Sequence, residues 1–193
     1  MIETAIVLKS YFPLQPRLVL LNNANERLDG VLPTNLGQRL RPGYVISYHR
    51  LNQRLFAKLH AVELASVPGI SNCEQLLFWQ QILEICLELI PTGAFSPGVF
   101  ELLMSINNHF SNYSSSQRHL LICYLLSLCG FYPEVDQENL EYARLVSRLT
   151  VQPGFDFKNF EDNHKIENFL HYWIKQFVEQ NSSNQLNFLL RTI

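Results

Sequence analysis

The sequence has little charge for its length. Only 17% of its 193 residues are Asp, Glu, Lys or Arg, whereas 47% are hydrophobic. Soluble domains typically carry about 25% charged residues. A chain of this length and composition can bury a sizeable core in one large or two small domains. The low charge also suggests that a partner covers part of the apolar surface.

Cysteine is scarce, and its spacing excludes the common zinc motifs. Cys73, Cys86, Cys123 and Cys129 form no C-x-x-C pair, and structural zinc sites need closely spaced thiolate or imidazole ligands. The cysteines fall in apolar, helix-like stretches, where a free thiol behaves as a small hydrophobe. We therefore expect buried free thiols, as in a protein of a reducing cytoplasm.

The histidines are scattered as well. His164 and His171 are seven residues apart, and we expect no carboxylate at ligand spacing to complete a site with them. His109 and His119 lie near the ends of expected helices, which favours exposed or capping roles. The expectation is that this chain holds no metal.

Motifs for nucleotide binding and catalysis are missing. The sequence has no G-x-x-x-x-G-K-S/T loop, no G-x-G-x-x-G and no G-x-S-x-G elbow. Its carboxylates stand mostly alone, and the adjacent pair Glu161 and Asp162 suits the start of a helix. We expect no enzyme and no cofactor. With no signal peptide and no apolar run near ~18 residues, we also expect a cytoplasmic protein without a membrane span.

The first third of the chain favours β-structure. The Asn-rich segment 22–27 suits a hairpin turn, and Gly30 suits a bulge or a bend in a curled sheet. Five short strands in so few residues predict a small closed barrel such as an OB-fold, with an SH3-like barrel as the main rival. The strands are expected at residues 2–12, 17–24, 27–33, 43–50 and 54–65.

After residue 72 the hydrophobic period changes from two to 3.6. Ser71 or Asn72 is the expected N-cap of the first helix, and Ser96 that of the second. The fold class is therefore α+β, with an OB-like barrel over residues 1–66 and a helical domain over residues 67–193. Helices are expected at residues 73–90, 99–110, 117–130, 139–149, 165–180 and 184–193.

The charge is divided unevenly between the two parts. Residues 1–65 contain eight Lys or Arg and four Asp or Glu, a net charge of +4, and the remainder has seven basic and 13 acidic residues, a net charge of −6. Such asymmetry is typical of a polyanion-binding module joined to another domain, although a chance distribution is an alternative explanation.

Basic and aromatic residues interleave in the expected barrel. Single-stranded nucleic acid is held by cations along its backbone and by aromatic rings under its bases. For Tyr44, Tyr48 and Phe56 a place in the barrel core is the alternative. Tyr11 and Phe12 add further rings. We expect nucleic-acid contacts from Lys9, Arg17, Arg27, Arg39, Arg41, Arg50, Arg54, Lys58, Tyr44 and Tyr48, with Arg39, Arg41, Arg50 and Arg54 forming the central anion-binding surface.

Three segments resemble a known family. TAIVLKSYFPLQPRLVLLNNANERLDGVLP (4–33) resembles the opening strands of RecO, the bacterial recombination mediator. LLSLCGFYPEVDQ (125–137) resembles a helix end in that family, and FLHYWIKQFVEQNSSNQLNFLLRTI (169–193) resembles its closing segment. Each motif is short and apolar, but the three occur in the family's order and span nearly the whole chain.

The resemblance implies an OB-fold followed by a helical domain. It also implies a protein that binds single- and double-stranded DNA, anneals complementary strands and helps to load a recombinase. Its partners would be a RecR-like protein and the tail of the single-strand DNA-binding protein, in the bacterial cytoplasm near the nucleoid. The alternative is a protein-interaction adaptor that keeps the fold without strong DNA binding.

The sequence also departs from the family. PTNLGQRLRP (33–42) replaces a more basic loop, so that Arg39 and Arg41 alone would serve there. Many family members carry a zinc-binding cysteine cluster after the second segment, but Gln137 stands where its first cysteine would be. The chain is also shorter than typical members. These differences argue against zinc at that position and favour a divergent or reduced role.

Overall fold

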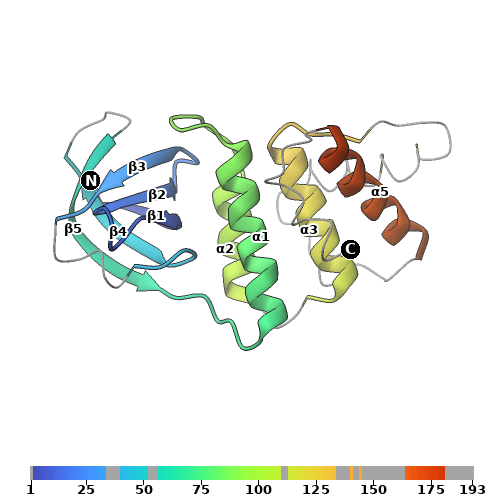
Figure 1. Cartoon of the computed structure of the whole chain (residues 1–193), viewed down its shortest axis with the longest axis horizontal. Helices are drawn as coiled ribbons and strands as arrows, with labels where there is room; N and C mark the ends of the chain where they lie inside the picture. Colours follow the sequence, from blue (N-terminus) through green and yellow to red (C-terminus); the bar gives the residue numbers. More distant parts are fainter. Residues whose placement is uncertain are drawn as a thin grey trace. The chain divides into compact units, whose positions relative to one another are not determined.

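The chain divides into two compact units, residues 1–111 and 112–193. The computed structural model describes residues 2–33, 40–51, 56–109, 113–133, 140, 144 and 164–180. The helices expected at 139–149 and 184–193 therefore lie almost wholly outside the described residues. The units divide later than the expected boundary at residue 66, because two helices after the barrel belong to the barrel's own unit (Figure 1).

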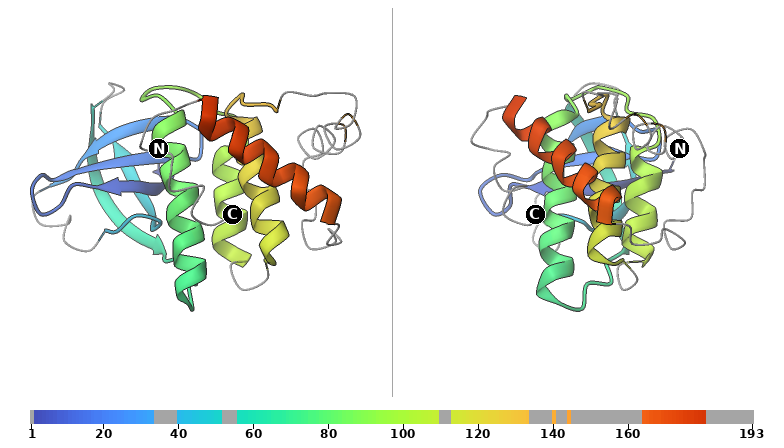
Figure 2. Two further views of the ribbon diagram at one scale, coloured as in Figure 1. Left: turned by 45° about the vertical axis from the view of Figure 1, so that its right-hand side comes forward. Right: turned by 90° about the vertical axis from the view of Figure 1, so that its right-hand side faces the viewer.

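Five strands close into a barrel in the first unit, as the sequence predicts. Their order around the barrel is β1-β2-β3-β5-β4. β3 and β5 run parallel, and the other four neighbouring pairs are antiparallel. Figure 2 shows the strands curling around a common interior. The strands are β1 (Ile2–Ser10), β2 (Arg17–Asn22), β3 (Arg27–Val31), β4 (Val45–Arg50) and β5 (Phe56–Ser66).

The barrel interior is filled by alternate residues of the strands, because successive strand side chains point to opposite faces. Its core consists of Ala5, Val7, Leu18, Leu20, Leu28, Leu32, Leu40, Ile46, Tyr48, Ala57, Leu59 and Val62. β1 is also buried on its outer face, at Ile6 and Leu8. The helices α1 (Cys73–Leu89) and α2 (Val99–His109) contact β1 and account for this second buried face.

The inward alternation of β5 breaks near its middle. The sequence pattern predicts that Ala61 follows Ala57 and Leu59 into the core, but Ala61 is exposed and Val62 is buried instead. Ala61 has a φ of 48°, and the pairing with β4 shifts register between Ser47 and His49. An irregularity of this kind adds a residue to one strand and reverses which side chains face inward.

The starts of the two helices depend on asparagine side chains. Asn72 caps α1, as one of the two expected caps, by accepting a hydrogen bond from the backbone N–H of Gln75 at 2.9 Å. α2 uses a remote residue: Asn25, in the turn between β2 and β3, accepts from the backbone N–H of Phe100 at 2.8 Å. The Asn25 side chain also donates to Glu101 at 3.0 Å. These bonds fix α2 against the barrel turn.

Gly43 lets the barrel approach Trp79 of α1 closely. It precedes β4 and donates its N–H to the carbonyl of Val7 at 2.7 Å. Its φ of 88° is a left-handed conformation that favours glycine. The Nε1 atom of the buried Trp79 lies 2.0 Å from where a Cβ on residue 43 would stand. Glycine is therefore required here both for the turn and for the packing of α1.

The second unit is described mainly through two helices, α3 (Ser115–Leu128) and α5 (His164–Gln180). α3 begins with a capping box between Ser114 and Gln117. Figure 2 shows α5 crossing α3, and the two helices are in contact. α5 buries an apolar stripe that consists of Phe169, Leu170, Trp173, Ile174, Phe177 and Val178.

The four cysteines are free, as expected, but they are not all buried. Cys86 and Cys123 are buried, Cys129 is half-buried and Cys73 is exposed at the first position of α1. Burial raises the pKa of the Cys129 thiol to about 12 and raises that of Cys123 well above its ordinary value. Within the described residues, no helix is both long and apolar enough to cross a membrane.

Candidate nucleic-acid interface

A cluster of cations and aromatic rings lies where β1 ends and where β2 and β5 begin. Lys9 Nζ lies 5.1 Å from the ring centre of Tyr11. The guanidinium carbon of Arg17 lies 5.2 Å from the ring centres of both Tyr11 and Phe56. These distances are typical of cation–π contacts. We call Lys9, Tyr11, Arg17 and Phe56 the Arg17 cluster.

Strand register brings this cluster together. Arg17 stands opposite Val31 of β3, and β3 in turn pairs with β5 through Val31 with Lys58 and Asp29 with Phe56. Residues two apart on a strand share a face, so Lys58 lies on the same face of β5 as Phe56. The parallel pairing of β3 with β5 thus places a lysine and an exposed ring from residues 56–58 beside cations from residues 9–17.

An ion pair holds the central guanidinium. Arg17 Nη2 donates to Asp29 Oδ2 at 2.7 Å, and the side chain of Asp29 is only 6% exposed, against 33% for Arg17. The hydrogen bond and the negative charge of Asp29 raise the pKa of Arg17 above its ordinary value. Because Asp29 is buried below it, Arg17 stays charged and keeps its position against the two rings.

The exposed parts of the cluster suit a nucleic-acid strand. The Phe56 side chain is 57% exposed although it begins a strand, so its ring can receive a stacked base. Lys9 on β1 and Lys58 on β5 are both exposed. Flexible lysines contact phosphates without reading sequence. The arrangement combines an exposed ring with exposed cations, the two kinds of group that hold single strands.

Two of the expected cations have structural partners instead. Arg27 donates through Nη1 to the carbonyl oxygens of Leu87, at 2.5 Å, and Ile90, at the end of α1. Arg50 forms an ion pair with Glu26 at 2.8 Å, and its side chain is 11% exposed. We therefore leave Arg27 and Arg50 out of the proposed interface.

The expected central surface is described only in part. Arg39 and Arg54 lie outside the described residues. Arg41 is exposed in the segment that leads into β4. With Arg50 paired to Glu26, the described residues place the strongest cation and aromatic grouping around Arg17 rather than along Arg39–Arg54.

The two expected tyrosines lie in the barrel core or against it. Tyr48 is completely buried, and its hydroxyl donates to Glu3 Oε2 at 2.9 Å. A fully buried ring cannot stack on a base, so Tyr48 is removed from the interface. Tyr44 is half-buried and packs against the barrel core. The alternative considered from the sequence, a place in the barrel core, is therefore correct for Tyr48, whereas the Phe56 ring is exposed.

The buried Tyr48 predicts a pH dependence of stability. Burial, followed by the charge of Glu3, raises the pKa of Tyr48 far above its ordinary value of about 10. Above about pH 10 the unfolded chain releases this proton and the folded chain keeps it, so stability falls with pH. We expect Tyr48→Phe to reduce that fall by about 1.4 kcal/mol per pH unit, measured by urea unfolding at alkaline pH.

The exposed Tyr132 provides the control for this measurement. Tyr132→Phe also removes one phenolic hydroxyl, but from the surface of the other unit. An unchanged alkaline slope in Tyr48→Phe would contradict the proposed role of the buried hydroxyl.

Sequence reasoning noticed Tyr11 and Phe56 but did not place them in the site, and it missed Asp29. Tyr11 and Phe56 gave a weak signal, because Tyr11 lies next to a strand end and Phe56 lies at one. At strand ends the alternation of side chains no longer indicates which residues face inward. Asp29 could have been suspected as a single acid inside the strand 27–33, which is otherwise mostly apolar. Its pairing with Arg17 depends on the β2–β3 register.

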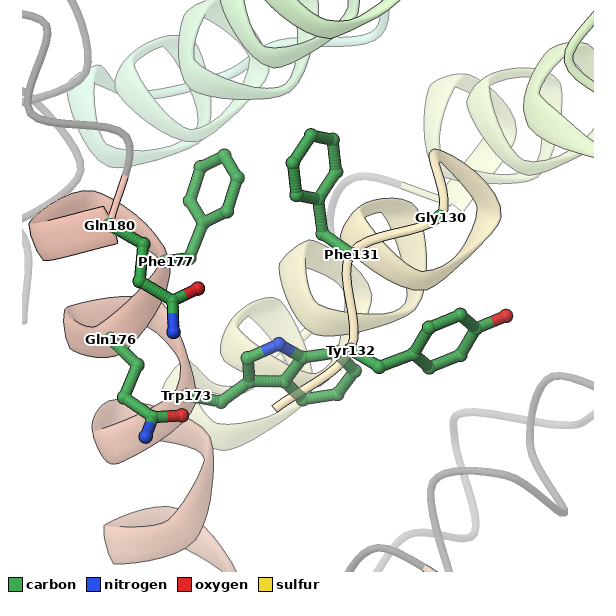
Figure 3. Close-up of a pocket in the computed structure, with 7 residues that line it drawn as sticks. All are labelled: Gly130, Phe131, Tyr132, Trp173, Gln176, Phe177 and Gln180. Atoms are coloured by element: carbon green, nitrogen blue, oxygen red, sulfur yellow. The ribbon is translucent and has the colours of Figure 1, made fainter. Parts of the chain in front are cut away.

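The second unit contains a shallow pocket of about 160 Å³ between the end of α3 and α5 (Figure 3). Phe131 and Phe177 meet edge to face, with ring centres 5.0 Å apart. Trp173 is buried and Tyr132 is largely exposed. The lining residues are Gly130, Phe131, Tyr132, Trp173, Gln176, Phe177 and Gln180.

The histidines differ from expectation. His119 is buried, at 6% exposure, rather than exposed at a helix end. It faces His171 of α5, with His171 Nε2 and His119 Nδ1 3.1 Å apart. Glu167 also stands near both rings, four residues before His171. The expectation that no carboxylate accompanies His171 at ligand spacing was therefore wrong, because i and i+4 share one helix face.

No family model matches the chain, and no curated protein matches it.

Proposed function

We propose that this chain is a non-catalytic DNA-binding protein of the RecO type, and that its barrel binds single-stranded DNA at the Arg17 cluster. The observation that carries the proposal is the exposed Phe56 ring under the guanidinium of Arg17, which also lies over Tyr11, the ring that Lys9 contacts. Neither the resemblance nor the charge distribution located that surface.

The strand order supports an OB-type barrel. β5 lies between β3 and β4, as in a Greek-key arrangement and unlike a simple meander. OB-folds bind oligonucleotides on the face of strands 2 and 3 and through the loops that follow strands 1 and 4. Tyr11 lies in the first of these loops and Arg17 begins β2, so the cluster occupies the part of the barrel that this fold uses.

The wider role follows from the resemblance. A mediator would bind both single- and double-stranded DNA, promote annealing, and act with a RecR-like protein and the single-strand DNA-binding protein in the bacterial cytoplasm. Its chemistry needs only reversible contacts with phosphates and bases, in agreement with the absence of sequence motifs for catalysis. The barrel would supply the DNA contacts, and the helical unit would receive a partner.

A salt-titrated binding assay tests this proposal. Fluorescence anisotropy with labelled single-stranded and duplex DNA should show binding that weakens steeply between about 50 and 200 mM salt. Lys9→Ala/Lys58→Ala should lower the salt slope for single strands by about 1.4, roughly 0.7 for each lost phosphate contact. Phe56→Ala should weaken binding by about 1–3 kcal/mol with an unchanged slope, since it removes stacking and no charge.

Lys175→Ala is the matched control, because Lys175 is an exposed lysine on α5. It should leave both affinity and slope unchanged. Arg41→Ala tests the surface that the sequence favoured. The proposal fails if wild-type protein binds neither DNA at low salt, or if the Lys9→Ala/Lys58→Ala and Phe56→Ala variants bind as well as wild type.

The pocket beside α5 favours a second candidate, the adaptor without strong DNA binding. Aromatic pockets with amide groups at their rim accept apolar peptide side chains, and Gln176 and Gln180 line this one with Trp173 and Phe177. Capture of a RecR-like protein or of the single-strand DNA-binding protein tail, without DNA affinity at low salt, would select this function.

A further inference from the structure

Two helices of the second unit bring three potential metal ligands together. His119 comes from α3, and Glu167 and His171 come from α5. One ligand atom from each residue lies within 4.8 Å of the other two. Among the described residues this is the group whose donor atoms converge in this way.

Local structure explains the convergence. Glu167 and His171 are separated by one helical turn and share a face of α5. His119 lies in the second turn of α3, whose start is fixed by the Ser114–Gln117 capping box. One turn further along, Cys123 Sγ lies 3.7 Å from the carbonyl of Leu170. The helices are therefore closely packed immediately beside the three ligands.

The geometry fits a small tetrahedral ion. Zinc binds imidazole nitrogen at about 2.0–2.1 Å, which sets two nitrogens of a tetrahedral site roughly 3.3 Å apart. His171 Nε2 and His119 Nδ1 are 3.1 Å apart, and their rings are nearly perpendicular, with an interplanar angle of 86°. Once the proton between these two nitrogens has been released or moved to another ring nitrogen, small ring rotations would turn a lone pair of each toward a common ion.

The ligand set indicates which class of metal would bind. Two imidazoles and one carboxylate suit zinc and related divalent transition metals, whereas magnesium and calcium prefer oxygen ligands. Three protein ligands leave a fourth tetrahedral position for water. His119 is buried and the other two residues are half-buried, so the ion would sit at the edge of the helix interface with access to solvent.

We propose that His119, Glu167 and His171 form a zinc-class metal site that links α3 to α5. This site goes beyond the proposed DNA-binding function and does not depend on it. It is distinct from the zinc-binding cysteine cluster of many RecO proteins, because it uses no cysteine and draws its ligands from two helices. Binding would fix the helix pair that also borders the aromatic pocket.

Titration of untagged, chelator-treated full-length protein with Zn²⁺ tests the site. Isothermal titration calorimetry should give one ion per chain, and Zn²⁺ should raise the midpoint of thermal unfolding. Loss of groups that merely support metal ligands costs 10–100-fold in affinity, so loss of a ligand should cost at least as much. We expect Glu167→Gln to weaken binding at least about 10-fold and His171→Asn about 100-fold or more.

Glu167 and His171 are half-buried, so these variants should fold even where substitution of the buried His119 would not. His60→Asn, at an exposed position of β5, and Cys73→Ser, at the exposed thiol, are the controls. Both should bind Zn²⁺ as wild type does. The proposal is overturned if wild-type protein takes up no Zn²⁺, or if Glu167→Gln and His171→Asn bind it undiminished.

Discussion

Gly43→Ala should lower the free energy of unfolding of the barrel unit by about 3–4 kcal/mol. One part of this loss is the cost of holding a non-glycine residue at a φ of 88°, about 1–3 kcal/mol. The other is overpacking, because the new methyl group would stand 2.0 Å from Trp79 Nε1 and forced repacking costs about 1–3 kcal/mol. Trp79 is 1% exposed and cannot move aside.

Urea unfolding followed by tryptophan fluorescence measures this loss. Trp79 reports on the barrel unit and Trp173 on the helical unit, and the chain has no other tryptophan. Gly130→Ala is a matched control, since Gly130 has the same φ of 88° and nothing within 4 Å of the added carbon. Gly130→Ala should lower the free energy of unfolding of the helical unit only by the cost of the backbone strain. Equal losses in the two variants would show that contact with Trp79 does not matter.

Arg27→Met should cost about 3 kcal/mol of unfolding free energy. The last turn of α1 contains no basic residue of its own, and the guanidinium of Arg27 on β3 supplies the missing cation to the carbonyls of Leu87 and Ile90. Hydrogen bonds from a charged donor contribute about 1.5–3 kcal/mol each, and a cation at a helix C-terminus is itself favourable. The methionine would keep the bulk of the side chain but leave the carbonyls without this donor.

Denaturant unfolding again measures the effect. Arg27→Lys should recover only part of the stability, because an ammonium group lacks the planar fork of donors that a guanidinium presents. Arg41→Met serves as the control, since Arg41 is exposed and surface changes usually stay within about 0.5 kcal/mol. A loss of less than about 0.5 kcal/mol in Arg27→Met would remove Arg27 from this structural role.

Local sequence patterns were sufficient to predict the elements of the barrel. The strands, the switch to helices near residue 72 and the cap at Asn72 follow from alternation, helical period and side-chain chemistry within a few residues. Ala61 marks where this reasoning ends, because an irregularity in pairing with β4 reverses the inward face without a local signal.

The candidate site was harder to predict, because it depends on which strands become neighbours. A count of arginines in residues 1–65 cannot tell Arg17, whose partner is Asp29, from Arg50, whose partner is Glu26. The two residues of each pair stand 12 and 24 positions apart in the chain, respectively. The contact between His119 and His171 was hard to predict for the same reason, because the two residues lie 52 positions apart in the chain and on different helices.

The parallel pairing of β3 with β5 has a consequence for synthesis on the ribosome. β5 pairs with both β3 and β4, and it is the last of the five strands to be synthesised. The edges of β3 and β4 that pair with β5 therefore stay unpaired until the residues up to Ser66 have emerged. Unpaired edges invite pairing with other chains, and nascent domains are vulnerable in this state. For the same interval Arg17 and Phe56 remain unassembled, so a nascent chain would acquire its cation and aromatic surface only when the barrel closes.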